Sequence, residues 1–288
     1  MQPKSAILEN VLLALPSVRA RHEPGSPLYQ LLKLVAQREV RTLFSEDTTV
    51  ARDFPPFGSL AFPYFKMGAI DSLHLFGLDE LIIFSFYWAN RTRYRRILDI
   101  GANIGLHSIM MSRCGFEVRA YEPDPTHFNL LQRNLALNQC ASVRPVNAAV
   151  SSKPGTMEFV RVLGNTTGSH LAGSKPDPYG ELERFPVSVE AIGAIWPETD
   201  LIKLDAEGHE KEILGATRPE HWQNTDAMIE VGSPANARFL YDHFTSLEVN
   251  LFAQKTNWQL VRNFEAMPTS HRDGSLFVTI KSAMSWSE

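Results

Sequence analysis

The sequence predicts an α/β protein in which a Rossmann-like, doubly wound and mostly parallel sheet follows a small helical lead-in. Two patterns lead to this prediction. From residue 95 onward, short apolar strands alternate with helical segments, which is typical of βαβ units. Before that point, apolar residues recur at helical spacing. We therefore assign residues 1–78 to the N-terminal lead-in and residues 79–288 to one Rossmann-like domain.

The lead-in contains two amphipathic segments. Apolar residues at helical spacing predict one helix over 7–15, which Pro16 ends, and a second over 28–36. Three prolines and a glycine within 53–64 predict a loop or irregular segment. Asp79 is then expected to cap a helix that continues to Trp88.

The Rossmann-like region is expected to contain five strands, with two more near the end of the chain. Helices are predicted over 106–114, from Pro125 onward, and after the fourth strand as far as Gly215. Residues 153–185 are rich in Gly, Pro, Ser and Thr and show one strand-like stretch, 157–160. The strands are expected at 96–100, 116–122, 143–150, 200–205, 227–231, 258–261 and 276–280.

The composition is that of a soluble globular protein, with 44% hydrophobic and 21% charged residues. The 28 basic and 32 acidic residues give a net charge of −4, which disfavours a general nucleic-acid coat. Cys114 and Cys140 lie in apolar stretches, so we expect buried thiols rather than a disulfide framework or a metal site. No apolar run approaches the ~20 residues of a membrane span. Glu9 and Asn10 interrupt a signal-peptide core, so the expected location is cytoplasmic.

The first strand of the sheet leads into a turn of small residues that suits a ligand. Residues 99–105 read Asp-Ile-Gly-Ala-Asn-Ile-Gly, between a predicted strand and a predicted helix. Gly101 and Gly105 let a ligand approach the backbone, and the N–H groups at the helix start favour polar or anionic groups. Glu122 ends the second strand, 17 residues after Gly105, where its carboxylate can accept hydrogen bonds from both hydroxyls of a ribose.

Two cofactor classes use this arrangement. A dinucleotide fingerprint requires glycine at positions 101, 103 and 106, but this chain carries Asn103 and Leu106. S-adenosylmethionine also needs an adenosine site and has no pyrophosphate to cradle. The sequence therefore favours S-adenosylmethionine, and a nicotinamide-dependent oxidoreductase is the disfavoured alternative.

Three motifs resemble those of the FkbM-type methyltransferases. They are residues 97–105 (Ile-Leu-Asp-Ile-Gly-Ala-Asn-Ile-Gly), 122–125 (Glu-Pro-Asp-Pro) and 202–210 (Ile-Lys-Leu-Asp-Ala-Glu-Gly-His-Glu), and the resemblance covers about residues 95–232. It implies the class I methyltransferase fold, S-adenosyl-L-methionine as cofactor and, as in many members, O-methylation of sugars or natural products. One departure is Glu190-Ala191-Ile192, where family members often carry Thr-Leu-Asp.

Candidate site residues follow from these motifs. We expect the cofactor to contact the turn after the first strand, the end of the second strand and, through its adenine, the end of the third. The predicted cofactor-binding residues are Asp99, Gly101, Asn103, Gly105, Glu122 and Asn147.

Methyl transfer to a hydroxyl requires in-line geometry and, second, a base near the carboxyl edge of the sheet. The predicted catalytic residues are Asp205, which closes the fourth strand, and Glu207 and His209 in the following loop. The alternative for Asp205 is capping of that loop, and for Glu207 it is a helix N-terminal role. His107 and His170 are weaker candidates for the base.

Three further features each allow two interpretations. Lys203 lies inside an apolar strand, so it either pairs with acids such as Asp99 or Glu230 or snorkels outward. Four arginines within 91–96 either bind a phosphate of the acceptor or form a solvated helix end. Residues 165–170 either contact a polyol or form an ordinary loop.

Together these residues predict an S-adenosylmethionine-dependent O-methyltransferase that acts on a hydroxyl of a sugar, a glycan or a sugar-bearing natural product. One alternative is a ribose or N-methyltransferase acting on RNA or another large acceptor, supported only by the arginines. Another is a catalytically inactive cofactor-binding module, which Asp205 and Glu207 disfavour. The expected partner is a small-molecule hydroxyl acceptor rather than nucleic acid, and the oligomeric state stays open.

Overall fold

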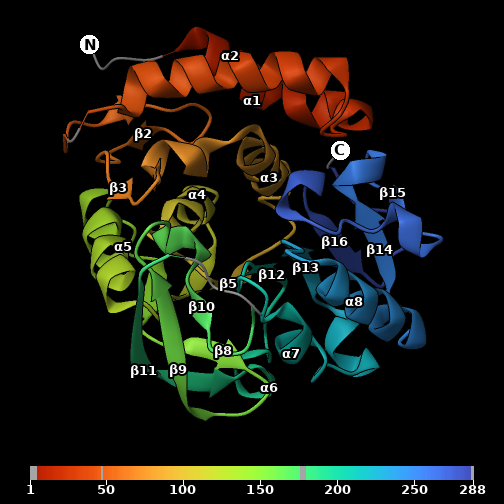
Figure 1. The fold of residues 1–288 in the computed structure, drawn as a ribbon. Helices are drawn as coiled ribbons and strands as arrows, with labels where there is room; N and C mark the ends of the chain where they lie inside the picture. Colours follow the sequence, from red (N-terminus) through yellow and green to blue (C-terminus); the bar gives the residue numbers. More distant parts are fainter. Residues whose placement is uncertain (1–4, 47, 176–179, 287–288) are drawn as a thin grey trace.

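The computed structural model describes residues 5–46, 48–175 and 180–286. Residues 1–4, on which the expectation of no signal peptide partly depends, lie outside them. Within the described residues the central sheet has eight strands (Figure 1). In spatial order they are β15 (Gln259–Leu260), β14 (Asn250–Ala253), β16 (Leu276–Thr279), β13 (Asp226–Ile229), β12 (Leu201–Leu204), β5 (Arg96–Ile100), β6 (Glu117–Tyr121) and β7 (Val143–Val146).

The central sheet is parallel in its middle and antiparallel at one edge. β12 pairs in parallel with β5 and β13, and β6 pairs in parallel with β5 and β7. β16 runs antiparallel to β13 and β14. The chain winds from β5 outward to β7 and then returns to β12 on the other side of β5. The predicted doubly wound, mostly parallel sheet is confirmed, and such a reversal of strand order is where α/β proteins bind ligands.

Helices cover both faces of the sheet because successive strand side chains point to opposite faces. Leu201 packs in one buried cluster with α3 (Leu78–Ala89), α4 (Leu106–Arg113) and α5 (Pro125–Leu137). Its neighbour Ile202 packs in another cluster, on the opposite face. The helices of that second cluster are α6 (Ile192–Ile195), α7 (Glu210–Leu214) and α8 (Pro234–Ser246).

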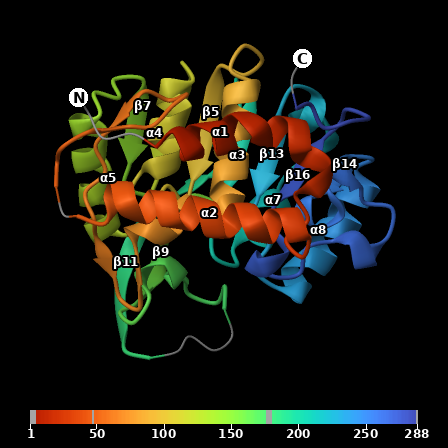
Figure 2. The same cartoon turned by 90° about the horizontal axis from the view of Figure 1, so that it is seen from above.

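The lead-in packs against α3 and shares its core with the sheet. Figure 2 shows α1 (Ala6–Ala14) and α2 (Pro27–Phe44) lying side by side over α3. Leu8 of α1, Phe44 of α2 and Ile97 of β5 belong to one buried cluster. At the predicted boundary near residue 78 the secondary structure changes, but the buried core is continuous. A separate domain over 79–288 stays a prediction. Among the described residues, no helix has the length and apolarity to cross a bilayer.

Three details of the lead-in differ from the prediction. The second helix continues to Phe44 because its apolar spacing extends through Val40. The predicted loop contains a short hairpin, β1 (Arg52–Asp53) with β2 (Ser59–Leu60). Asp79 does not cap α3, since the N-cap is Gly77. Asp79 lies in the first turn of α3 and accepts hydrogen bonds from the Tyr29 hydroxyl at 2.7 Å and from Gln254 at 2.5 Å.

The prediction of one strand over 143–150 is wrong. β7 ends at Val146, and β8 (Ala149–Ser151) belongs to a second sheet. The Ala148 N–H donates to the Val146 carbonyl at 3.0 Å, which turns the chain out of the central sheet. β8 then pairs in parallel with β11 (Leu182–Ala191), a partner that lies far along the sequence.

The second sheet was not predicted from the polar segment 153–185. Its order is β10 (His170–Leu171), β9 (Gly155–Val162), β11 and β8. β9 and β11 pair antiparallel along the whole length of β9, and Phe159, Leu171 and Val187 form a small core. In Figure 1 this sheet lies below α4 and α5. The helix α8 and the strand β14 were likewise not predicted from the sequence.

Candidate active site

A cavity lies where the carboxyl edge of the central sheet meets the second sheet. It encloses about 620 Å³, open mouth included. Phe159 and Leu171 contribute apolar wall from the second sheet. Six of the predicted site residues line this cavity, namely Gly101, Asn103, Glu122, Asp205, Glu207 and His209.

Glu122 directly follows β6 and presents a buried carboxylate to the cavity. One oxygen accepts the Asn103 N–H at 2.9 Å, and the other accepts the Asp124 N–H at 2.8 Å. A carboxylate offers about four lone-pair sites, so each oxygen keeps capacity for one more donor. Burial raises the pKa of the Glu122 carboxyl to about 8, although the two N–H groups oppose this rise.

Backbone packing requires a glycine at position 101, whereas the predicted reason was close approach of a ligand. Its φ of +81° lies in the left-handed region, and a Cβ there would come within 1.8 Å of the Asp205 carbonyl oxygen. The absent side chain therefore faces the turn after β12 and not a ligand. Asn103, at φ +52°, lines the cavity, and its side-chain oxygen accepts the Ile104 N–H at 2.8 Å.

Asp99, Gly105 and Asn147 are not among the residues that line the cavity. Asp99 is fully buried and accepts a 2.6 Å hydrogen bond from the Ser108 hydroxyl. A Cβ at Gly105 would lie 2.5 Å from Leu131 in α5, so this glycine allows helix packing. Asn147 is exposed and donates to the main-chain carbonyls of Glu122 and Pro123. These residues shape the walls, and their direct contact with a cofactor stays a prediction.

The loop after β12 places two carboxylates on the cavity. Asp205 follows the strand, and Glu207 has a φ of +51°. Glu207 forms an ion pair of 2.5 Å with Lys175. Burial, and then the charge of Asp205, raise the pKa of Glu207 to about 7. Glu210 holds the loop by accepting the main-chain N–H groups of residues 206 and 208.

His209 bridges two hydroxyls at the edge of the cavity. Its Nε2 lies 2.9 Å from the Ser151 oxygen, and its Nδ1 lies 3.0 Å from the Ser174 oxygen. Burial lowers the pKa of the imidazole, so the neutral form predominates at neutral pH. Because both ring nitrogens have partners, His209 has less freedom than Glu207 to receive a proton.

Lys203 is buried and does not snorkel outward. Its ammonium lies 3.5 Å from the Asp205 carboxylate and 3.4 Å from the Gly101 carbonyl oxygen. Burial alone would lower the pKa of Lys203. The surrounding carboxylates of Asp205, Asp99, Glu80 and Glu230 nevertheless raise it above its ordinary value. The expected charge network is present, with Asp205 as the ion-pair partner in place of Asp99 or Glu230.

The remaining candidates divide between the cavity and distant parts of the fold. His170 lines the cavity, as do Thr166, Thr167 and Ser169. His107 instead binds Tyr87 and Glu80 between α3 and α4. The arginines lie just before β5 and at its first residue, at the edge opposite the cavity, where Arg95 pairs with Glu117 and Arg96 pairs with Glu198.

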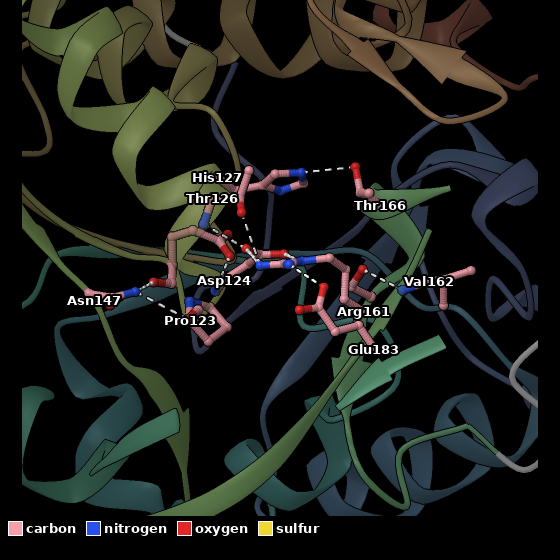
Figure 3. Close-up of polar contacts among 11 residues, drawn as sticks. Pro123, Asp124, Thr126, His127, Asn147, Arg161, Val162, Thr166 and Glu183 are labelled. Carbon is pink, nitrogen blue, oxygen red and sulfur yellow. Dashed lines mark hydrogen bonds and ion pairs between the residues drawn. The ribbon is translucent and has the colours of Figure 1, made fainter. Parts of the chain in front are cut away.

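Arg161, which the sequence did not single out, joins the second sheet to the start of α5 (Figure 3). Asp124 caps α5, and Arg161 of β9 donates two hydrogen bonds to its carboxylate, at 2.7 and 2.5 Å. Arg161 also pairs with Glu183. His127 of α5 similarly binds the Thr166 hydroxyl at 2.9 Å. No local sequence signal marks Arg161 or His127, because their partners lie 37 and 39 residues away.

We expect Arg161→Met to destabilise the protein by about 2–3 kcal/mol. Removing one partner of a buried ion pair costs ~3–5 kcal/mol, and the Thr126 N–H that still donates to Asp124 reduces this. The measurement is thermal or urea unfolding. The control is Arg184→Met on neighbouring β11, whose pair with Glu158 is about half exposed and is expected to contribute ~0–1 kcal/mol. Equal effects of the two substitutions would contradict the anchoring role of Arg161.

The fold and the cavity define a Rossmann-like α/β protein with a candidate small-molecule site at the carboxyl edge of the sheet. The family described as the methyltransferase FkbM domain matches residues 99–262, more than half of the chain. The chain belongs to this family and is a methyltransferase.

Similar proteins include two curated relatives. The methyltransferase sdnD of Sordaria araneosa is 30% identical over 179 residues, which are 49% of this chain and 68% of that protein. The hexuronic acid methyltransferase AglP of Haloferax volcanii is 29% identical over 119 residues, 40% of this chain and 47% of that protein. The match therefore spans about half the length of the second relative.

A solved structure of the same family is more distant. The crystal structure of methyltransferase FkbM from Methylobacillus flagellatus KT gives a TM-score of 0.42 at 15% identity. The match covers 64% of this chain and 43% of that chain. The family assignment accordingly depends on the sequence match and not on this superposition.

Proposed function

We propose that the protein is an S-adenosylmethionine-dependent O-methyltransferase for a hydroxyl of a sugar, a glycan or a sugar-bearing natural product. The observation that carries the proposal is the buried Glu122 carboxylate, which faces the same cavity as Asp205 and Glu207. The sugar acceptor is further supported by the relative named as a hexuronic acid methyltransferase. Residues 79–288 would form the methyltransferase domain.

The residues present fit this cofactor. The free lone pairs of Glu122 suit the two hydroxyls of a ribose. Ala148, Val150 and Phe159 offer an apolar surface to an adenine. Asp205 and Glu207 compensate the positive charge of a sulfonium. When bound, S-adenosylmethionine would supply an electrophilic methyl group. Its transfer would form the O–CH₃ bond, break the S–CH₃ bond, leave S-adenosylhomocysteine and release the hydroxyl proton.

Glu207 is the preferred acceptor of that proton. A base works best when its pKa lies near the working pH, and the pKa of Glu207 is raised to about 7. Lys175 holds the carboxylate at the cavity and stabilises its ionised form. His209 is the second candidate, and Asp205, paired with Lys203, is assigned to the cationic end of the cofactor.

The alternative acceptors have less support. The support for an RNA acceptor came from the arginines within 91–96. They lie before β5 or at its first residue, and therefore at the amino edge of the sheet. Arg95 and Arg96 are already paired with Glu117 and Glu198. A catalytically inactive module would not require two carboxylates, one with its pKa raised to neutrality, on the cavity.

We expect Glu207→Gln to lower turnover at least ~100-fold while cofactor affinity stays within a few-fold. General-base catalysis contributes about 10²–10⁴-fold, and the amide keeps the size of the side chain. Labelled S-adenosylmethionine is offered with neutral glycosides, nucleotide sugars and glycans, and mass spectrometry detects the added CH₂. Calorimetry with S-adenosylhomocysteine measures cofactor affinity.

The matched control is Glu212→Gln, because Glu212 lies on the next helix with a half-exposed side chain. It should leave both quantities unchanged. Loss of turnover in His209→Ala, together with normal turnover in Glu207→Gln, would transfer the role of base to His209. Failure of wild-type protein to bind either cofactor form would overturn the proposal.

A further inference from the structure

A second cavity lies on the other side of Lys203. It is formed by the start of α3, the ends of β12 and β13, and residues 271–275 near the end of the chain. It encloses about 620 Å³, open mouth included. Its lining includes Asp79, Glu80, Ile83, Lys203, Glu230 and His271.

Lys203 connects the linings of the two cavities. The Lys203 ammonium lies 3.4 Å from the Gly101 carbonyl oxygen and 3.5 Å from the Asp205 carboxylate. Gly101 and Asp205 both line the first cavity, whereas Lys203 lines the second. A group bound in the second cavity therefore lies next to the proposed transfer site.

The second cavity combines hydrogen-bonding groups with a negative potential. Burial alone would raise the pKa of Glu80, but its 2.9 Å hydrogen bond with His107 and the nearby positive charges lower it, so Glu80 is ionised. The ammonium of Lys203 already has Asp205 as its ion-pair partner. Within the described part of the chain, the Glu230 carboxyl has no hydrogen-bond or ion-pair partner, so it is available to a ligand hydroxyl.

The carboxyl groups on the second cavity indicate which ligands it accepts, because Asp79, Glu80 and Glu230 all line it and the lysine that lines it is already paired. Burial, and then the charges of Asp205, Glu207 and Glu80, raise the pKa of Glu230 well above its ordinary value. A site in which a resident carboxyl resists ionisation also resists a second carboxylate brought by a ligand. Neutral hydroxyls meet no such penalty, because they can donate to Glu80 and exchange hydrogen bonds with Glu230.

We propose that this second cavity binds the methyl acceptor and selects a neutral polyhydroxyl ring over an acidic sugar, in contrast to the relative named as a hexuronic acid methyltransferase. The inference rests on the proposed function, since it names the acceptor class of the same site. Ile83 supplies an apolar surface for the C–H face of such a ring. Glu80 and Glu230 are recognition residues in this assignment. The reacting hydroxyl extends past Lys203 toward Asp205 and Glu207, which line the first cavity.

The test compares two probes on the full chain saturated with S-adenosylhomocysteine. Saturation-transfer NMR at neutral pH measures the binding of methyl α-D-glucopyranoside and of methyl α-D-glucopyranosiduronate, which carries a free carboxylate. We expect the neutral glycoside to bind at least about tenfold more tightly, which corresponds to ~1.4 kcal/mol. Equal or tighter binding of the glucuronide would overturn the inference.

Two variants test whether the glycoside binds in the second cavity and whether the Glu80 carboxylate causes the preference for the neutral probe. Glu80→Gln removes the ionised carboxylate and should reduce the difference between the probes to about threefold or less. His271→Trp places a bulky ring at an exposed position on the cavity and should weaken the glycoside at least about fivefold, with unchanged S-adenosylhomocysteine affinity. The exposed position makes this second variant informative even if Glu80→Gln fails to fold.

The control is Glu220→Gln, an exposed acid outside both cavities, which should change neither probe. Unchanged glycoside binding in His271→Trp would remove the acceptor from this cavity. If the wild-type protein does not bind S-adenosylhomocysteine, the proposed function is refuted instead. The two failures are therefore distinguishable.

Discussion

Replacing Glu122 with alanine is expected to weaken the binding of S-adenosylhomocysteine by about 10²–10⁴-fold. The carboxylate is proposed to accept two hydroxyl hydrogen bonds, and hydrogen bonds to a charged group contribute ~1.5–3 kcal/mol each. Since 1.4 kcal/mol is a factor of ten, the two bonds together account for this range. Isothermal titration calorimetry on the folded variant measures the change.

The control for this prediction is Glu117→Ala, at the opposite end of the same strand. Glu117 has an exposed side chain that pairs with Arg95 and lies away from the cavity. Its substitution should leave the affinity unchanged. If Glu122→Ala binds S-adenosylhomocysteine as tightly as the wild-type protein, the ribose lies elsewhere.

The pH dependence of binding provides a second readout of the same carboxylate. Because the pKa of Glu122 is raised to about 8, the protonated form predominates in the free protein at neutral pH. Accepting two hydroxyls favours the ionised form, so wild-type affinity should rise with pH up to about 8 and then level off. The part of this slope that comes from Glu122 should disappear in Glu122→Ala.

The sequence predicted the central sheet, and the residues that meet at its carboxyl edge, because these features are local. The strand at 96–100, the turn that follows it and Glu122 at the end of the next strand are each encoded within a few residues. The order of the βαβ units then brings their carboxyl ends to one edge. Glu122, Asp205 and Glu207 therefore meet on one cavity, as the motifs implied.

The second sheet could not be predicted because its partners are distant in the sequence. Gly155 lies opposite Val189, and β8 pairs with the end of β11 across some 40 residues. The polar composition between these strands is typical of a loop, and only 157–160 shows a strand pattern. Arg161 and His127 were missed for the same reason, since their partners Asp124 and Thr166 lie on other elements.

Gly101 illustrates how a motif residue can be identified correctly for an incomplete reason. A glycine in this turn suggests close approach of a ligand, and a larger residue would then block binding in an intact fold. Instead, the space for its side chain is filled by the main chain of Asp205. The turns after β5 and β12 also share a hydrogen bond from the Asp205 N–H to the Ile100 carbonyl, at 3.0 Å.

We therefore expect Gly101→Ala to destabilise the fold by at least about 4 kcal/mol. A left-handed backbone costs an L-residue roughly 1–2 kcal/mol, and overpacking adds about 1–3 kcal/mol or more. A Cβ at 1.8 Å from a carbonyl oxygen should cost a free energy at the upper end of the overpacking range, because main-chain atoms cannot rotate away. At ~2–4 °C per kcal/mol, the melting temperature should fall by about 10 °C or more.

Gly115→Ala separates the two contributions to this loss. Gly115 has a similar φ of +86°, but a Cβ there would meet no atom within 4 Å. It should therefore show only the conformational cost of roughly 1–2 kcal/mol, a fall of about 2–8 °C. Differential scanning calorimetry of both variants measures the difference. If Gly101→Ala melts no lower than Gly115→Ala, the turns after β5 and β12 can separate to admit a methyl group. Gly101 would then be needed for the ligand, as the sequence alone suggested.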